Sequence, residues 1–232
     1  MTRHAPLRRY FWRRLTVLTA VTWALAITLS CREPTAPLTN GPQIAGIGRT
    51  AAAIPVLPDS MRSWSFSNDQ AGTACTNASV CRLVDGPVGA LMGTGSAELA
   101  TNASTDGIAL MLPGFGGTRL DHLTELRYAT YRQTADAGNN LAIALQFNVD
   151  YDLTDASTGW QGRIVFEPYQ GASGTVLQGT WQNWDAKAGK WWGTKASVPR
   201  NGVSIANPCV QATPCTWAQL LATFPNAGVH VT

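Results

Sequence analysis

The chain of 232 residues is 45% hydrophobic and only 13% charged, so it is long enough and apolar enough for one domain with a substantial core. The 17 Lys and Arg residues outnumber the 14 Asp and Glu residues, but five arginines lie in the first fourteen positions. Without that segment 12 basic residues face 14 acidic ones. A nearly neutral domain of this kind attracts phosphate backbones weakly, so we expect no nucleic-acid partner.

The N-terminus has the pattern of an export signal. A basic segment without acidic residues, MTRHAPLRRYFWRR, is followed by an apolar run over residues 15–29. As a helix this run would extend about 22 Å, short of the ~30 Å hydrocarbon core of a bilayer, which favours cleavage over permanent insertion. We therefore expect residues 1–30 to be a signal peptide with a helical segment, removed from the mature protein.

The sequence TLSC directly after the apolar run ends in Cys31. It resembles the lipobox of bacterial lipoproteins, and this resemblance implies that Cys31 is lipidated and becomes the new N-terminus. A plain cleaved signal, giving a secreted protein, is the alternative. The pair Arg8 and Arg9, followed by Phe11, also resembles a twin-arginine export signal, while ordinary secretion is the simpler expectation.

Four further cysteines fall into two pairs with equal spacing, Cys75 with Cys81 and Cys209 with Cys215. Paired cysteines in an exported chain favour disulfides, and loops this short favour closure within each pair over the other connectivities. Each bridge would stabilise the fold by only about 2 kcal/mol through chain entropy. A zinc site is the rival hypothesis, but it would need closer cysteines or nearby histidines, so we expect no metal.

The chain after Cys31 divides into a tether and a β-rich domain. Residues 31–58 are rich in Pro, Gly, Ala and Thr, which is typical of a flexible linker. Residues 59–232 consist of short apolar or alternating runs separated by Gly, Asn, Asp and Pro, the pattern of an all-β domain. Strands are expected at residues 63–68, 96–101, 107–113, 125–133, 141–152 and 162–170. One short helix is expected near the C-terminus, with Thr216 as its N-cap.

Several segments together resemble a β-sandwich domain of exported bacterial envelope proteins, similar in shape to jelly-roll carbohydrate-binding modules. They are GSAELAT, TRLDHLTELRYATYRQ, ALQFNVDYD, GRIVFEPY, GTWQNWDA with KWW, and CTWAQLLATFPNAGV. The resemblance implies two packed antiparallel sheets, a location outside the cytoplasm and no known catalytic site. Domains of this type continue past FPNAG with one further strand, so we expect this domain to lack its last strand and to expose a sheet edge.

Residues 179–194, GTWQNWDAKAGKWWGT, are expected to form a hairpin rich in tryptophan. Because side chains alternate along a strand, each arm should turn one tryptophan into the core and one outward. An outward indole offers an apolar face on which a sugar ring can stack. The candidate ligand-binding residues are therefore Trp181, Trp184, Trp191 and Trp192, with Asp150 and Asp152 of the strand expected at residues 141–152 as hydrogen-bond partners.

The best carboxylates for catalysis are Asp150, Asp152 and Asp155 with Glu167. A glycosidase needs two carboxyl groups about 5 to 9 Å apart across the scissile bond, and nothing in the sequence places these in that way. We expect a solvated strand face that runs into a turn. A calcium site is a minor alternative, because DYDLTD supplies several oxygens but lacks the glycine and distal glutamate of an EF-hand.

The sequence thus favours a non-enzymatic binding module without a cofactor. Its expected partners are the cell-envelope membrane, through a lipid on Cys31, and an envelope or extracellular glycan. A structural or protein-interaction β-sandwich without a ligand is the first alternative, and a glycoside-active enzyme is the second.

Overall fold

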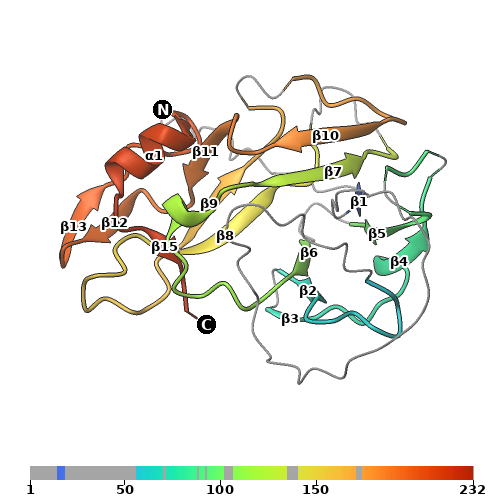
Figure 1. The fold of residues 1–232 in the computed structure, drawn as a ribbon, viewed down its shortest axis with the longest axis horizontal. Coiled ribbons are helices and arrows are strands. Elements are labelled where there is room, and N and C mark those ends of the chain that lie inside the picture. Colours follow the sequence, from blue (N-terminus) through green and yellow to red (C-terminus); the bar gives the residue numbers. More distant parts are fainter. Residues whose placement is uncertain are drawn as a thin grey trace, which may run out of the picture.

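The computed structural model describes residues 56–69, 72–87, 89–91, 93–101, 107–134, 141–170 and 174–231, and in addition the backbone of strand β1 (Leu15–Leu18). Short strands, paired antiparallel in several sheets, make up most of the described chain, with one short α-helix near the C-terminus (Figure 1). The predicted all-β class is confirmed. Apart from β1, which is extended, the expected signal helix and most of the tether lie outside the described residues.

The first sheet has five strands in the order β10-β7-β1-β5-β4. Besides β1 they are β4 (Cys81–Asp85), β5 (Gly95–Leu99), β7 (Arg127–Tyr131) and β10 (Trp181–Asp185). All four neighbouring pairs are antiparallel. The sheet therefore joins a segment near residue 15 to the β4–β5 pair on one side and the β7–β10 pair on the other.

The second sheet also has five strands, in the order β14-β11-β9-β8-β15. They are β8 (Leu145–Asp150), β9 (Arg163–Phe166), β11 (Lys190–Gly193), β14 (Cys215–Thr216) and β15 (Gly228–Val229). Leu145, Phe147 and Val149 of β8 pack in the core, as the alternation of its sequence predicts.

Smaller elements complete the described fold. They are a sheet of β2 (Ser65–Asn68), β3 (Thr73–Ala74) and β6 (Ile108–Met111), the hairpin of β12 (Ser197–Arg200) and β13 (Val203–Ala206), the 3₁₀-helix η1 (Leu120–His122), and α1 (Trp217–Thr223). Thr216 caps α1 as expected, and Gln219 completes a capping box. Figure 1 shows α1 and the β12–β13 hairpin at one end of the molecule, and the β2–β3–β6 sheet with β4 at the other.

The predicted hairpin over residues 179–194 is wrong. Its two arms belong to different sheets, because β10 pairs with β7 while β11 pairs with β9 and β14. Buried Ala186 lies at the crossing, where its N–H donates to the Leu126 carbonyl at 2.9 Å. The connection is therefore an arch from one sheet to the other, and long-range partners satisfy the backbone of both arms.

One hydrophobic core receives side chains from both five-stranded sheets and from α1. Trp191 of β11 is completely buried and contacts Phe166, with ring centroids 5.7 Å apart, and Trp217, at 5.0 Å. Tyr128 of β7 packs edge-on against Phe166 of β9, with centroids 6.1 Å apart. The aromatic residues of this core thus hold strands of the first sheet against strands of the second.

The two predicted disulfides, Cys75–Cys81 and Cys209–Cys215, are both present. Cys81 and its neighbour Val80 belong to a small second core with Ala100. Two disulfides indicate an oxidising or extracellular environment. Within the described part of the chain, no helix combines the length and the apolar character that a membrane span requires.

Candidate functional site

The tryptophans after residue 31 differ sharply in exposure. Nine tryptophans occur in the chain, and seven of them follow residue 31, all in described residues. Trp160 has 51% of its surface exposed and is the most exposed of the seven. Trp184, Trp191 and Trp217 are buried, whereas Trp64, Trp181 and Trp192 are half-buried.

Two of the predicted ligand-binding tryptophans belong to the core. The Trp184 indole N–H donates to Thr130 Oγ1 at 2.8 Å, and the Trp191 indole N–H donates to the Ala186 carbonyl, also at 2.8 Å. Their place among the candidate ligand-binding residues is corrected, because both are buried in the core. Each arm turns one indole into this core, as expected, although β10 and β11 belong to different sheets.

Trp181 and Trp192 lie on the other face of their strands, as the two-residue alternation predicts. The Trp192 indole N–H donates to Glu167 Oε2 at 2.9 Å. The Trp181 ring packs on Tyr131 with centroids 5.5 Å apart, and its indole nitrogen is buried. Each of these two side chains thus already has a contact within the domain, Trp192 with Glu167 and Trp181 with Tyr131.

Asp150 and Asp152 are buried, which contradicts the expected solvated strand face. Asp150 Oδ1 accepts from the Asp152 N–H at 2.9 Å and from Gln161 Nε2 at 3.0 Å. Asp152 accepts from the N–H and hydroxyl of Thr154 and from the Asn201 N–H, and the hydrogen bond from Thr154 is the main cause that lowers its pKa. Both carboxylates hold the turn after β8, so the oxygens that accept these hydrogen bonds already have partners within the domain.

Glu167 lies at the opposite end of the β8–β9 pair from Asp150. Asn148 is opposite Arg163 in the register, and Leu145 is opposite Phe166. The two carboxylates are therefore about six positions apart along the strands, or roughly 20 Å. This separation does not fit a glycosidase, whose two carboxyl groups lie about 5 to 9.5 Å apart.

Glu167 forms a buried polar cluster of its own. Its Oε2 accepts from the Trp192 indole at 2.9 Å, the Tyr169 hydroxyl at 3.2 Å and Gln211 Nε2 at 3.5 Å. Burial raises the pKa of this carboxyl, and the three hydrogen bonds only partly oppose the shift. The cluster links the end of β9 to β11 and to the loop closed by the second disulfide.

The exposed tryptophan stands beside a polar surface on β8 and β9, here named the Trp160 face. Its other members are Asp69, Gln146, Asn148, Arg163 and Lys195. The Trp160 indole N–H donates to Asn148 Oδ1 at 3.1 Å, and Lys195 Nζ lies 4.8 Å from the centre of the ring. The hydrogen bond holds the N–H edge of the indole, and the ammonium group of Lys195 lies over its ring.

Arg163 organises the polar part of the Trp160 face. Its Nε donates to Asn148 Oδ1 at 3.3 Å, and its Nη1 donates to Asp69 Oδ2 at 2.6 Å and to Gln146 Oε1 at 3.4 Å. Side chains of Arg163 and Asp69 remain 29% and 28% exposed. A ligand would thus meet an apolar ring beside amide, guanidinium and carboxylate groups whose positions are already set.

Sequence reasoning missed Trp160 as a site because it lies in a loop, outside every expected strand. The local sequence DASTGWQG surrounds the indole with small and turn-forming residues. A lone tryptophan in such a segment, unlike one in an alternating run, has no strand neighbours to bury it.

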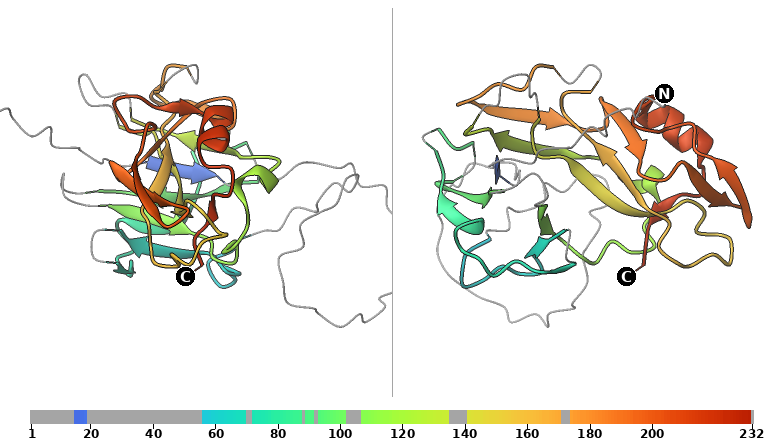
Figure 2. Two further views of the ribbon diagram at one scale, coloured as in Figure 1. Left: turned by 90° about the vertical axis from the view of Figure 1, so that its left-hand side faces the viewer. Right: turned by 180° about the vertical axis from the view of Figure 1, so that it is seen from behind.

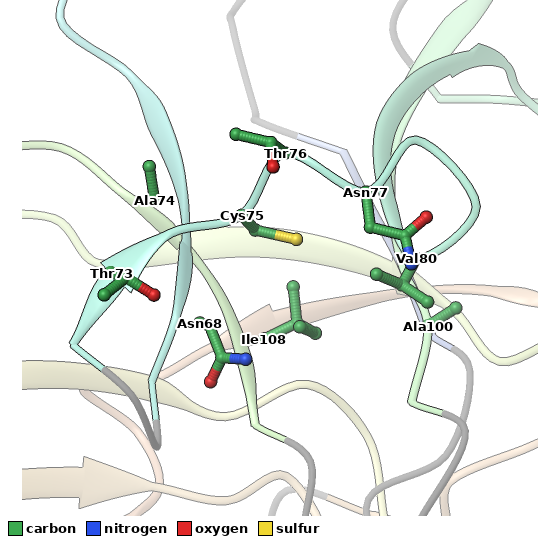
Figure 3. Close-up of a pocket in the computed structure, with 9 residues that line it drawn as sticks. All are labelled: Asn68, Thr73, Ala74, Cys75, Thr76, Asn77, Val80, Ala100 and Ile108. Carbon is green, nitrogen blue, oxygen red and sulfur yellow. The ribbon is translucent and has the colours of Figure 1, made fainter.

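A hollow of about 290 Å³ lies between the β2–β3–β6 sheet and the loop of the first disulfide (Figure 3). It is lined by Asn68, Thr73, Ala74, Cys75, Thr76, Asn77, Val80, Ala100 and Ile108. Asn77 Oδ1 accepts from the N–H and hydroxyl of Ser79, so this amide serves the turn. The hollow has no charged lining, and none of the predicted ligand-binding residues lines it.

Among the described residues, no three His, Cys, Asp or Glu side chains are close enough to hold a metal ion. Searches against protein families, curated proteins and solved structures found no match to this chain.

Proposed function

We propose that this protein is an exported β-sandwich of jelly-roll type, held at the envelope membrane by a lipid on Cys31, which binds a glycan through the Trp160 face. The observation that carries the proposal is the exposed indole of Trp160 in a domain that buries or half-buries its six other tryptophans. Exposing so large an apolar ring loses burial energy, which a stacking role would explain.

The chemistry of the Trp160 face suits a pyranose. A sugar ring has an apolar C–H face and a rim of hydroxyls, so it stacks on an aromatic ring while its edge exchanges hydrogen bonds. Asn148, Arg163 and Asp69 supply both donors and acceptors within one connected network. Because Asn148 and Lys195 already hold the indole, binding would immobilise few additional side chains.

The proposal includes no catalytic step. The two strongest carboxylate candidates, Asp150 and Glu167, lie at opposite ends of a strand pair, and Asp150 is used by the turn that it supports.

The test is a polysaccharide pull-down and glycan array with wild type, Trp160→Ala and Trp160→Phe. Wild type should bind, Trp160→Ala should lose at least about tenfold in affinity, and Trp160→Phe should keep part of it, because a smaller ring still stacks. Leu177→Ala is the matched control, since Leu177 is another exposed apolar residue of the domain. Undiminished binding by Trp160→Ala, or no glycan bound by wild type, would contradict the proposal.

A further inference from the structure

The first sheet contains one strand that an exported protein is expected to lose. β1 lies between β5 and β7 and pairs antiparallel with both; it is the blue strand in Figure 2. Thr16 is opposite Glu98 on one side and Tyr131 on the other, and Val17 is opposite Ala97 and Thr130. In the described sheet order, β5 and β7 are connected only through β1.

Removing this strand would leave two unpaired edges inside the sheet. The outer edge of β5 is already paired with β4, and that of β7 with β10. The sheet would therefore split into two pairs of strands, each with a row of backbone N–H and C=O groups that lack partners. Such groups are costly when they are shielded from water, and they are a template for another strand.

The strands that flank β1 have the burial of central strands. Ala97 and Leu99 of β5 are buried, and so are Ala129 and Thr130 of β7. These residues are buried while β1 lies between the two strands, so the position that β1 occupies is an interior position of the sheet.

We propose that the gap between β5 and β7 is a strand-acceptor site, which takes an extended, uncharged segment of a partner polypeptide once the leader has been cleaved. The chemistry expected of the partner segment is that of β1, which fills the gap in the full chain. β1 has the sequence Leu-Thr-Val-Leu, carries no charge and runs antiparallel to both neighbouring strands. Backbone hydrogen bonds on both sides would supply the affinity, as in other cases of strand addition.

Charge would be excluded from the position of the occupant that Val17 holds. The residues opposite it, Ala97 and Thr130, are buried, so a charged side chain there would lose its hydration without an ionic partner. At the Thr16 position one opposite residue is Glu98, which already pairs with Arg82. The proposal rests on removal of the leader and is independent of glycan binding at the Trp160 face.

The first experiment opens the gap in the full chain with Val17→Pro and adds a dye-labelled peptide of residues 12–21. Proline lacks the N–H of a paired strand and is not accepted in a central position. Thr22→Pro is the control in the same leader but outside β1. The peptide should bind Val17→Pro at least about tenfold more tightly than wild type or Thr22→Pro, and a peptide with proline in place of Val17 should not bind. Equal binding to all three chains, or none to a Val17→Pro chain that keeps both disulfides and its near-ultraviolet dichroism, would overturn the proposal.

A second experiment covers the case in which Val17→Pro does not fold. In a Cys31→Ser background, Thr16→Cys is combined with Glu98→Cys, its opposite residue. Opposite residues in an antiparallel pair are about 4.5 to 5.5 Å apart, within reach of a disulfide. Thr16→Cys with Arg82→Cys is the control, because Arg82 is one strand further away, at roughly 10 Å. We expect a disulfide between the two introduced cysteines in the first variant and none in the control. If the first variant does not cross-link, the acceptor-site proposal is contradicted, and the glycan proposal is unaffected.

Discussion

Trp191 is completely buried and donates its indole N–H to a backbone carbonyl, whereas Trp160 has half of its surface exposed and donates to the side chain of Asn148. The Trp191 ring packs between Phe166 and Trp217, so its surface is used by the core. The Trp160 ring instead has the ammonium group of Lys195 above it. The same residue type therefore stabilises the fold at one position and offers a ligand surface at the other.

This difference predicts opposite results for two alanine variants. Trp191→Ala should lower the free energy of unfolding by about 3–5 kcal/mol, because it leaves a large cavity in the core. Trp160→Ala should change it by less than about 0.5 kcal/mol, as exposed substitutions usually do. Urea denaturation followed by circular dichroism measures both, and equal losses would show that Trp160 is also a core residue.

Glu167 should make stability depend on pH in an unusual direction for a carboxylate. Burial raises its pKa in the folded protein above that of the unfolded chain, which is about 4.3. The folded state then binds the proton more tightly than the unfolded state. The contribution of Glu167 to the free energy of unfolding is therefore greatest below the unfolded-state pKa, and it is lost as the pH rises through the folded-state pKa.

Comparison with Glu167→Gln isolates this effect. The glutamine keeps an oxygen that accepts from Trp192 but carries no charge. Denaturation from pH 4 to pH 8 should show wild type losing stability relative to Glu167→Gln as the pH rises, with Trp192 fluorescence reporting the same change. A difference that stays constant over this range would contradict a raised pKa.

At the scale of elements, strand β8 and helix α1 could be predicted because their information is local. An apolar alternation defines β8, and a Thr-to-Gln capping box defines the start of α1. The information for the β12–β13 hairpin is equally local, although the strands expected from the sequence do not include it. Asn201 and Gly202 form its two-residue turn, both with positive φ, at 49° and 71°, which Asn-Gly adopts readily.

The β10–β11 connection could not be assigned from the same information. A short turn between two strands occurs both in a hairpin and in an arch between sheets, and the choice depends on partners far along the chain. β10 pairs with β7 about fifty residues earlier, and β11 pairs with β9 about twenty-five residues earlier. The same distant partners decide which tryptophan of each arm is buried, so the sequence could not separate Trp184 and Trp191 from the outward Trp181 and Trp192.

Strand β11 depends on a glycine at its end. A side chain at Gly193 would collide with Asn207 Nδ2 and the Tyr151 hydroxyl, both of which belong to buried residues. Gly193→Ala should therefore lower the free energy of unfolding by about 1–3 kcal/mol through overpacking. Gly159→Ala is the control, because no atom lies within 4 Å of the added methyl group. Thermal denaturation compares them, and a neutral Gly193→Ala would show that β11 shifts freely.

At the scale of the whole molecule, the first sheet joins residues 15–18 to strands on both sides, because β1 pairs with β5 and with β7. The two disulfides lie in the described domain and close loops of equal length, each with a sequence separation of 6. Short loops remove little entropy from the unfolded chain, so the joint core of the two sheets must supply most of the stability.

The proposed anchor predicts where the protein is found. Cys31→Ser should move the protein from the membrane fraction to the soluble fraction of the envelope, because the variant lacks the thiol to which the proposed lipid would be attached. Fractionation followed by immunoblotting measures this. A variant that stays in the membrane would mean that the leader itself is the anchor.

The central claim, that Trp160 is the glycan-binding aromatic, is tested most directly by nuclear magnetic resonance of the tryptophan indole N–H groups in the leaderless or full-length protein. Titration with a polysaccharide that the wild type retains should move the Trp160 signal in proportion to binding, while the signals of buried Trp184 and Trp191 stay in place. A titration that moves the Trp181 and Trp192 signals and leaves Trp160 unchanged would contradict the account.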